Sequence, residues 1–432
     1  MVSEADKQRV ISRIRSEELS TLVMRLVEVE SPSGNEKNIG DYLYSWLDQE
    51  GFSPRRVGML PGRFNVAGVM KGKGDGYRLL FNAHMDTAPE RSIRSGQPVR
   101  RAGWIEGDRL YGHAVMNDKG PMACFMLAAK AIKDSSVSLL GDLVLTMVCG
   151  EIGRNPIEEI VPPESVGREV GARWLVTHGP NAHVDFALVA EATGGGCAWV
   201  ECGEAGFKVT IRTERSVYLP HFERPESLEK SLNAVVRATP YIRAFESWAQ
   251  NVYEKRWRYE SAGGTVVPKC GIAAVRGGDP AGGGGTPDEC EIYLRFFTPP
   301  NIDPVWIERE LLSLGESTGV PAEVEMYSFS RGHEGRNVEP LVHAIAKAHK
   351  EVFGTSPNPV RPDIASMWRD VNVFNEVGIP SVTYGPGASM GMYAERGTVF
   401  VTVDELVAYA KSYALIALDL CNQERRTGAN LR

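Results

Sequence analysis

The chain has 432 residues, of which 43% are hydrophobic and 24% charged, with a formal net charge of -7 at pH 7. This acidic balance, without any dense run of lysine or arginine, argues against a nucleic acid or an anionic membrane surface as the main partner. At roughly 100 to 200 residues per domain, the length predicts two or three domains, each able to bury its own core.

The N-terminal stretch, MVSEADKQRV, is polar and lacks the apolar segment of a signal peptide. No later stretch reaches the roughly 18 uninterrupted apolar residues of a membrane span. The seven cysteines are scattered and odd in number, which favours reduced thiols over a disulfide framework. These features predict a cytoplasmic protein.

Helical and strand patterns alternate along the first half of the chain. Apolar residues recur at helical spacing over 18–29, and the loop 31–35 precedes a second helix that reaches residue 47. Short apolar runs between turn residues predict strands at 65–70, 78–83, 142–148 and 184–190. Between them, 122–132 and 165–177 are predicted as helices, and the first is apolar almost all round, which indicates burial.

Polar residues follow three of these predicted strands. They are His84 and Asp86 after the second strand, Glu151 after the third and Glu191 after the fourth. Strands that alternate with helices form a largely parallel sheet, whose carboxyl ends meet at one edge. His84 could therefore bind a metal there while Asp86 orients a ligand from behind, or His84 could simply be hydrogen-bonded at a strand end.

Six short motifs occur in a specific order. They are HMD at 84–86, LYGHAVMNDKGP at 110–121, GEIG at 150–153, VAEAT at 189–193, DVNVFN at 370–375 and GIPSVTYGPG at 378–387. In this order the chain resembles the metallopeptidase family of acetylornithine deacetylase, succinyl-diaminopimelate desuccinylase, aminoacylase and glutamate carboxypeptidase. The resemblance covers nearly the whole chain. It implies a zinc-peptidase-like α/β catalytic domain with a mixed, largely parallel sheet that holds two divalent ions, and an inserted α+β lid that commonly mediates dimerisation.

The resemblance places the lid at 204–328, between two parts of the catalytic domain at 1–203 and 329–432. Within the lid we predict strands at 207–213, 270–275 and 291–297 and helical structure over 227–258. The Gly/Pro-rich run 277–287 is a loop, and both a flexible linker and a substrate loop remain open for it.

The chain departs from the family pattern at three positions. Asn117 stands where the family has an aspartate that bridges the two metals, and Gly150 stands where it has the general base, which leaves Glu151. Glu395 stands where the family has its last histidine ligand. A neutral amide cannot offset the repulsion between two cations, so we expect one ion at most, Mn²⁺ or Zn²⁺, with Mn²⁺ better suited to a carboxylate-rich site.

The resemblance implies a role for each of these residues. His84, Asn117 and Glu191 would form one ligand set, with Asp118 as the alternative to Asn117. Glu151 and Glu395 would form a vacated or partial second set. Glu151, freed from a second metal, would take a proton from metal-activated water, and Asp86 would support the catalytic geometry.

Four further residues are candidates for substrate binding. Arg369 beside Asp370, and Arg295 on a lid strand, could pair bidentately with a substrate carboxylate, although each arginine fits a structural ion pair equally well. His221 is the nearest counterpart of the lid histidine that polarises substrates in the family, and a surface histidine is the alternative.

The sequence therefore predicts a metal-dependent hydrolase of a C–N bond in a small carboxylate-bearing substrate, homodimeric or of higher homo-oligomeric order, without a nucleic-acid or membrane partner. Because the paired-metal apparatus is reduced, an activated aromatic amine of the 5-nitroanthranilate type, hydrolysed with release of ammonia, is one specific hypothesis. N-acyl amino acid amidohydrolase or dipeptidase action is the second. A catalytically inactive, ligand-binding homologue is the remaining alternative.

Overall fold

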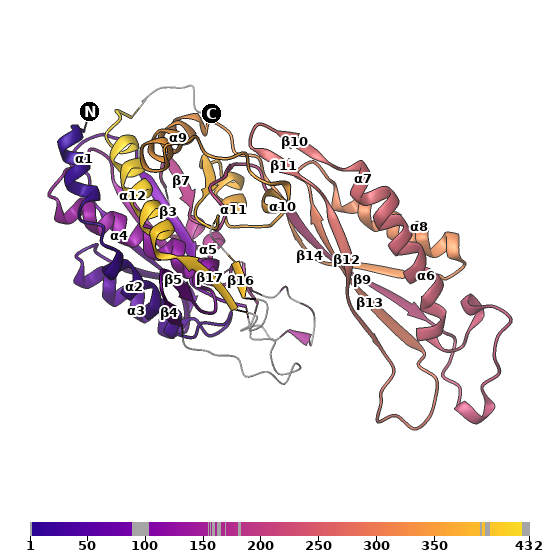
Figure 1. Cartoon of the computed structure of the whole chain (residues 1–432). Helices are drawn as coiled ribbons and strands as arrows, with labels where there is room; N and C mark the ends of the chain where they lie inside the picture. Colours follow the sequence, from indigo (N-terminus) through magenta and orange to yellow (C-terminus); the bar gives the residue numbers. More distant parts are fainter. Residues whose placement is uncertain are drawn as a thin grey trace.

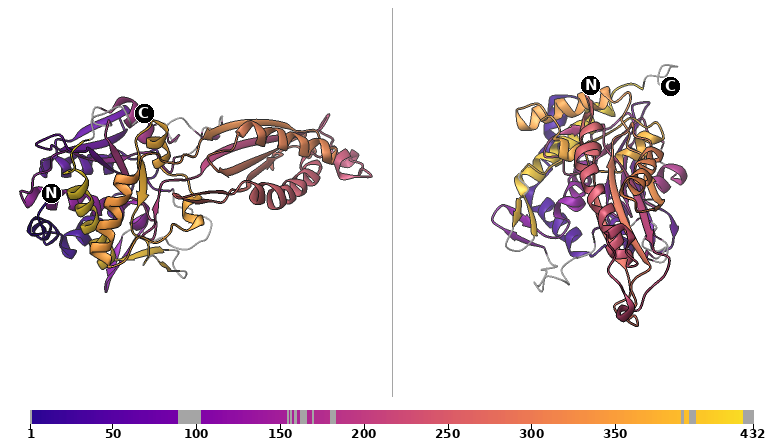
Figure 2. Two further views of the ribbon diagram at one scale, coloured as in Figure 1. Left: turned by 90° about the horizontal axis from the view of Figure 1, so that it is seen from above. Right: turned by 90° about the vertical axis from the view of Figure 1, so that its right-hand side faces the viewer.

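The computed structural model describes residues 2–88, 103–153, 155, 157, 160–161, 166–168, 170–179, 183–388, 391–393 and 398–425. The molecule has two lobes, which lie end to end along its long axis, as Figures 1 and 2 show. The N- and C-terminal parts of the chain both belong to the larger lobe, so the smaller lobe is an insertion.

The larger lobe is built on a seven-stranded sheet of order β1-β2-β6-β3-β7-β15-β8. Its strands are β1 Arg55–Leu60, β2 Arg63–Met70, β3 Leu79–His84, β6 Leu143–Val148, β7 Phe186–Val189, β8 Cys197–Ala198 and β15 Ser381–Tyr384. β3 pairs in parallel with β6 and β7, and β7 pairs in parallel with β15. The outer strands β1, β2 and β8 pair antiparallel, which confirms the predicted mixed sheet.

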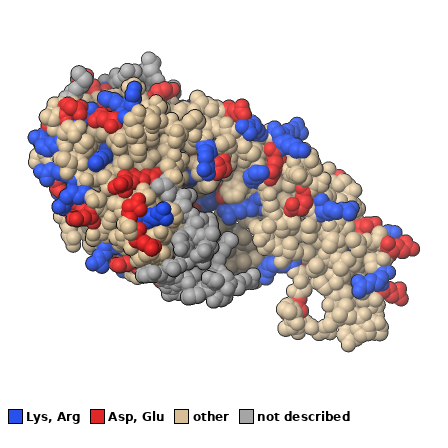
Figure 3. All heavy atoms as spheres, viewed as in Figure 1, with Lys and Arg blue, Asp and Glu red and all other residues tan. Residues whose placement is uncertain are grey.

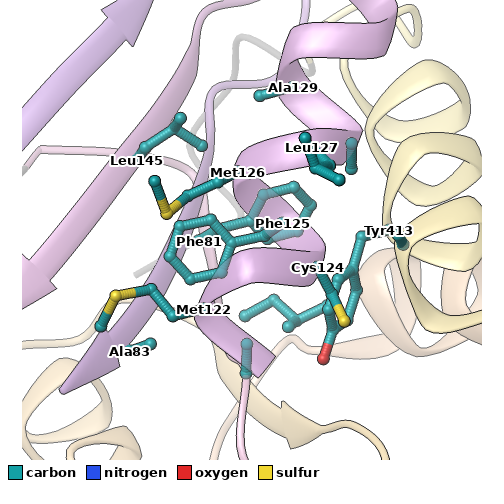
Figure 4. Packing of buried hydrophobic residues seen from close by; sticks show 14 of the residues in the cluster. Phe81, Ala83, Met122, Cys124, Phe125, Met126, Leu127, Ala129, Leu145 and Tyr413 are labelled. Atoms are coloured by element: carbon teal, nitrogen blue, oxygen red, sulfur yellow. The ribbon is translucent and has the colours of Figure 1, made fainter. Parts of the chain in front are cut away.

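Helices cover both faces of this sheet. One face carries α2 Ser16–Glu28, α3 Lys37–Gln49, α4 Gly120–Asp134, α9 Glu339–Phe353 and α12 Val403–Leu420, and the other carries α5 Ala172–His178 and α11 Val371–Glu376. In Figure 4, Phe81 of β3 packs against Phe125 of α4 and Tyr413 of α12, with ring centroids 5.9 and 5.6 Å away. This burial fixes the strand that ends in His84.

The larger lobe also contains shorter elements. They are α1 Glu4–Ile11, β4 Trp104–Glu106, β5 Arg109–Tyr111, the π-helical turn η2 Val115–Lys119, α10 Pro362–Ala365, β16 Gly391–Tyr393 and β17 Thr398–Thr402. Among the described residues of the predicted helix over 165–177, those at 166–168 and 170–171 are not helical, and α5 starts at Ala172. Arg168 has φ +60°, which an α-helix does not allow, and Gly171 lies just before the helix.

The smaller lobe is a four-stranded antiparallel sheet of order β12-β13-β9-β14 with helices on one face. Its main elements are β9 Gly203–Arg212, α6 Ala234–Trp248, β12 Lys269–Gly277, β13 Glu289–Thr298, α8 Pro304–Thr318 and β14 Glu323–Ser330. The predicted helical segment 227–258 is divided into η6 Leu228–Lys230, α6, η7 Ala249–Tyr253 and α7 Glu254–Arg256. A separate hairpin joins β10 Tyr259–Ser261 to β11 Gly264–Val266.

We propose the division 1–203, 204–328 and 329–432 as a description of the domains. β9 starts at Gly203, beside the first boundary, and the second boundary lies inside β14. No helix in the described part of the chain is both long and apolar enough to cross a membrane. On the face drawn in Figure 3, basic and acidic side chains are intermixed.

Candidate active site

His84, the last residue of β3, is held by one ring nitrogen. Its Nδ1 lies 2.8 Å from the backbone carbonyl oxygen of Asp86, so Nδ1–H donates to that oxygen. The other ring nitrogen, Nε2, lies 2.6 Å from Asn117 Oδ1, and 3.8 Å from a carboxylate oxygen of Glu151 and of Glu191. Burial opposes a charge on His84, but Glu151, Asp86 and Glu191 raise its pKa well above the ordinary value, so without a metal Nε2 carries a proton and donates it to Asn117 Oδ1. A metal ion can take the place of that proton, because a neutral imidazole offers its Nε2 lone pair among the same oxygens.

Asp86 lies behind this cluster and is completely buried. Its carboxylate accepts hydrogen bonds from the backbone N–H groups of Glu151, at 2.9 Å, and Ile152, at 3.0 Å, and from the hydroxyl of Ser33. Burial alone would raise the pKa of Asp86, but its bonds with His84, Ser33 and Glu151 lower it below its ordinary value. Asp86 therefore stays ionised and ties the loop of Glu151 to the end of β3.

The side chain of Asp118 gives the strongest evidence for a cation-binding site. Its side chain is fully buried, and within the described part of the chain neither carboxylate oxygen has a hydrogen-bond partner. Each of His84, Asp118 and Glu191 offers a ligand atom, and these atoms lie within 4.8 Å of one another. Burial, reinforced by Glu191, raises the pKa of Asp118 well above its ordinary value. Because a buried, partnerless carboxylate is costly, the donor set fits a divalent ion.

Glu151 belongs to the same cluster and is also buried. Burial raises the pKa of its carboxyl to about 8, with Glu191 and Asp370 adding to the rise and His84 opposing it. Asp370 sits nearby and accepts a hydrogen bond of 3.1 Å from Asn82 Nδ2. A carboxylate whose pKa is near neutral is suited to accept and return a proton.

Two glycines bring the loop of Glu151 against a neighbouring loop. A Cβ built on Gly153 would lie 2.0 Å from the Cα of Gly167, so the two backbones touch where no side chain fits. The backbone N–H of Arg168 donates to the carbonyl oxygen of Gly150 at 2.6 Å. The loop after β6, which carries Glu151, is thereby held in place by the neighbouring loop.

Gly153→Ala is expected to lower the free energy of unfolding by about 1–3 kcal/mol, because the new methyl group forces these backbones apart. Urea unfolding of both proteins measures the change. Gly271→Ala is the matched control, since a Cβ on Gly271 in β12 would meet no atom within 4 Å. Equal effects of the two substitutions would show that the contact between Gly153 and Gly167 is not constrained.

The other predicted site residues are placed as follows. The side chain of Arg369 is 5% exposed and is paired with Glu191 and Glu201. Arg295 is paired with Glu204 in the lid at 2.9 Å. His221 ends the short helix η5 Leu219–His221, in an exposed loop that Figure 1 shows at the end of the smaller lobe remote from the larger one. Glu395 lies outside the described residues.

Three residues beside this cluster escaped the sequence analysis. Ser33 contacts Asp86 from the loop before α3, and no sequence spacing announces this contact. Arg168 donates to Glu204 at 2.7 Å and its guanidinium lies 3.9 Å from the ring centre of Trp368. Glu201 is fully buried, and its charge within the apolar run AWVECG was the one usable signal, since buried charges are usually paired.

A histidine and carboxylates gathered at the carboxyl edge of an α/β sheet, beside an inserted α+β lobe, define the class of metal-dependent hydrolases. Residues 80–419 match the model of Peptidase family M20/M25/M40, and the chain belongs to this family. The family and the enzyme class, a hydrolase acting on C–N bonds, are thus confirmed.

Individual relatives cover nearly the whole chain at low identity. N-formyl-4-amino-5-aminomethyl-2-methylpyrimidine deformylase of Bacillus subtilis (strain 168) is 24% identical over 95% of this chain and 96% of its own. A tripeptidase from Staphylococcus aureus has a similar structure, with a TM-score of 0.69 and 16% identity over 95% of this chain and 100% of its own. The YXEP protein of Bacillus subtilis, described as a dinuclear metal-binding peptidase, gives a TM-score of 0.59 and 16% identity over 96% of this chain and 98% of its own.

Proposed function

We propose that this protein hydrolyses a C–N bond in a small carboxylate-bearing substrate and uses one divalent ion per chain, Mn²⁺ or Zn²⁺. The observation that carries the proposal is the buried group of His84, Asp118 and Glu191, in which both Asp118 oxygens lack a partner among the described residues. These three residues would hold the ion, with Asn117 Oδ1 beside them. A bound cation would lower the pKa of water and stabilise developing negative charge.

The protein residues would handle the proton. Glu151 has an oxygen 3.8 Å from His84 Nε2, as Glu191 has, so its carboxylate belongs to the same cluster. We propose that Glu151 accepts a proton from the attacking water and returns it to the leaving nitrogen. Asp86 would hold His84 and the loop of Glu151 in fixed positions relative to each other, through the hydrogen bonds described above.

Positive charge from an arginine of each lobe supports the proposal that the substrate carries a carboxylate. Arg168 of the larger lobe and Arg295 of the lid both donate to Glu204, at 2.7 and 2.9 Å. Two guanidinium groups on one carboxylate leave one positive charge, and Arg168 lies close enough to oppose the rise in the pKa of Glu151. We propose that this charge attracts the substrate carboxylate toward the cluster, so that Arg295 acts together with Arg168.

Two kinds of C–N bond fit this site. The name of the Bacillus subtilis deformylase favours an amide-type bond, which makes N-acyl amino acids and dipeptides the first candidates. The neutral Asn117 beside His84 favours the second candidate, an activated aromatic amine of the 5-nitroanthranilate type, because the ring can take up negative charge that a second cation would otherwise stabilise. We also propose a cytoplasmic homo-oligomer.

The substrate class can be tested with metal-free protein reloaded with Mn²⁺ or Zn²⁺. N-acyl amino acids and dipeptides are assayed for release of the free amine, and 5-nitroanthranilate for release of ammonia. We expect one of these classes to be hydrolysed, only with the ion present. A protein that binds carboxylates yet releases neither amine nor ammonia with any added ion would instead be an inactive, ligand-binding homologue.

A further inference from the structure

Arg369 is buried beside Glu191, and each nitrogen of its guanidinium group already contacts another protein atom. Nη1 donates to Glu201 Oε1 at 3.0 Å and to the backbone oxygen of Ile364 at 2.9 Å, while Nη2 lies 3.5 Å from Met367 Sδ. Nε donates to Glu191 Oε2 at 3.4 Å. This placement differs from the contact with a substrate carboxylate that the sequence suggested, because the guanidinium already has partners on each side.

The two oxygens of Glu191 face different groups. Oε2 receives the hydrogen bond from Arg369, whereas Oε1 lies 3.8 Å from His84 Nε2. A carboxylate held by one oxygen presents the other in a defined direction, and groups that contact a metal ligand from behind set its orientation. We infer that Arg369 is a positioning residue that makes Glu191 a one-oxygen ligand of the cation, an inference that rests on the proposed function.

Glu201 makes this arrangement compatible with a nearby cation. An uncompensated guanidinium beside a metal site would repel the ion. Glu201 is fully buried and is paired with Arg369 at 3.0 Å, so the two side chains together add no net charge. The structure therefore assigns Arg369 an orienting effect on Glu191, separate from any effect of its charge on the ion.

The sign of a change in Mn²⁺ affinity separates orientation from charge. Arg369→Met removes a positive charge, so a purely electrostatic role would make Mn²⁺ bind more tightly. Loss of orientation acts in the opposite direction, and we expect Mn²⁺ affinity to fall about 10- to 100-fold. Arg369→Lys keeps the charge but loses the planar fork, so its affinity should also fall. Calorimetric titration of the metal-free proteins with Mn²⁺ measures both variants.

Arg78→Met is the matched control for the removal of a paired arginine. The Arg78 side chain is 27% exposed and is paired with Asp142 at 3.5 Å, and Arg78 directly precedes β3, at the opposite end of the strand from His84. We expect Arg78→Met to lower the melting temperature of the metal-free protein but to change Mn²⁺ affinity by less than about threefold, as for a distant site. An equal loss of affinity in this control would indicate general destabilisation and overturn the inference.

Two results distinguish failure of this inference from failure of the proposed function. Because the titration requires no turnover, Mn²⁺ binding by the wild type with unchanged or tighter binding by both Arg369 variants refutes only the positioning role. If the wild type binds neither Mn²⁺ nor Zn²⁺, the proposed metal-dependent function fails and the inference fails with it.

Discussion

Glu151→Gln is expected to lower kcat/KM by about 10²- to 10⁴-fold, the usual contribution of a general base. Glutamine matches glutamate in size but cannot take a proton from water at neutral pH. The backbone N–H of residue 151, which donates to Asp86 Oδ1 at 2.9 Å, is unchanged by the substitution. The loop should therefore keep its place, so that the loss falls on the chemical step.

The dependence of the rate on pH provides a second test of Glu151 as the proton acceptor. A carboxyl must be ionised to accept a proton, so the wild-type rate should rise as pH increases through the pKa of Glu151. Burial places that pKa at about 8 without metal, and a bound cation would lower it. The residual rate of Glu151→Gln should lack this rise.

Ile152→Val is the matched control for the loop. Its backbone N–H also donates to Asp86, at 3.0 Å, and the smaller apolar side chain removes no charge. We expect it to retain activity within about threefold, since such a change in packing costs little. If Glu151→Gln were as active as this control, Glu151 would not be the proton acceptor.

The fold was predictable because its main signals are local. The run that ends in His84 is apolar and forms β3, and the continuous apolar stretch after Pro121 forms the buried helix α4, as expected. The alternation of strands and helices also placed His84, Glu151 and Glu191 at one sheet edge. Local patterns carry this information because residue spacing sets which face of an element is buried.

The parts that escaped prediction depend on contacts between distant residues. Arg369 is adjacent to Asp370 in sequence, but only the fold shows that its guanidinium is paired with Glu191 and Glu201. The contact between Gly153 and Gly167 likewise joins loops that share no periodic pattern. A side chain's identity limits its possible partners, yet the direction of a long side chain is set by packing that is remote in sequence.

Asp118→Asn is expected to weaken metal binding by more than the about 10- to 100-fold that is typical when a group behind a ligand is lost. The substitution replaces a buried anion, whose two oxygens lack partners among the described residues, with a neutral amide of the same shape. Metal-dependent stabilisation reports this loss directly, since saturation to 100 times Kd raises the free energy of unfolding by about 2.7 kcal/mol. Melting of both proteins with and without Mn²⁺ measures it.

Without metal, the same substitution should leave the protein at least as stable at neutral pH. Burial raises the pKa of Asp118 well above its unfolded value, so the folded state holds the proton more tightly. Ionisation of Asp118 therefore costs stability increasingly as pH rises from the unfolded pKa toward the folded one, and asparagine avoids this cost. A metal-free variant that melts well below the wild type at neutral pH would show that Asp118 supports the fold instead of a cation.

Asn117→Asp adds a carboxylate to the same site, where Asp118→Asn removes one. It tests how many metal ions each chain binds. It places a further carboxylate at the position of Asn117 Oδ1, 2.6 Å from His84 Nε2, and so supplies an anion that could offset the repulsion between two cations. We expect elemental analysis to give one ion per chain for the wild type and tighter or additional binding for this variant. Two tightly held ions in the wild type, as in the dinuclear Bacillus subtilis relative, would refute our explanation of Asn117.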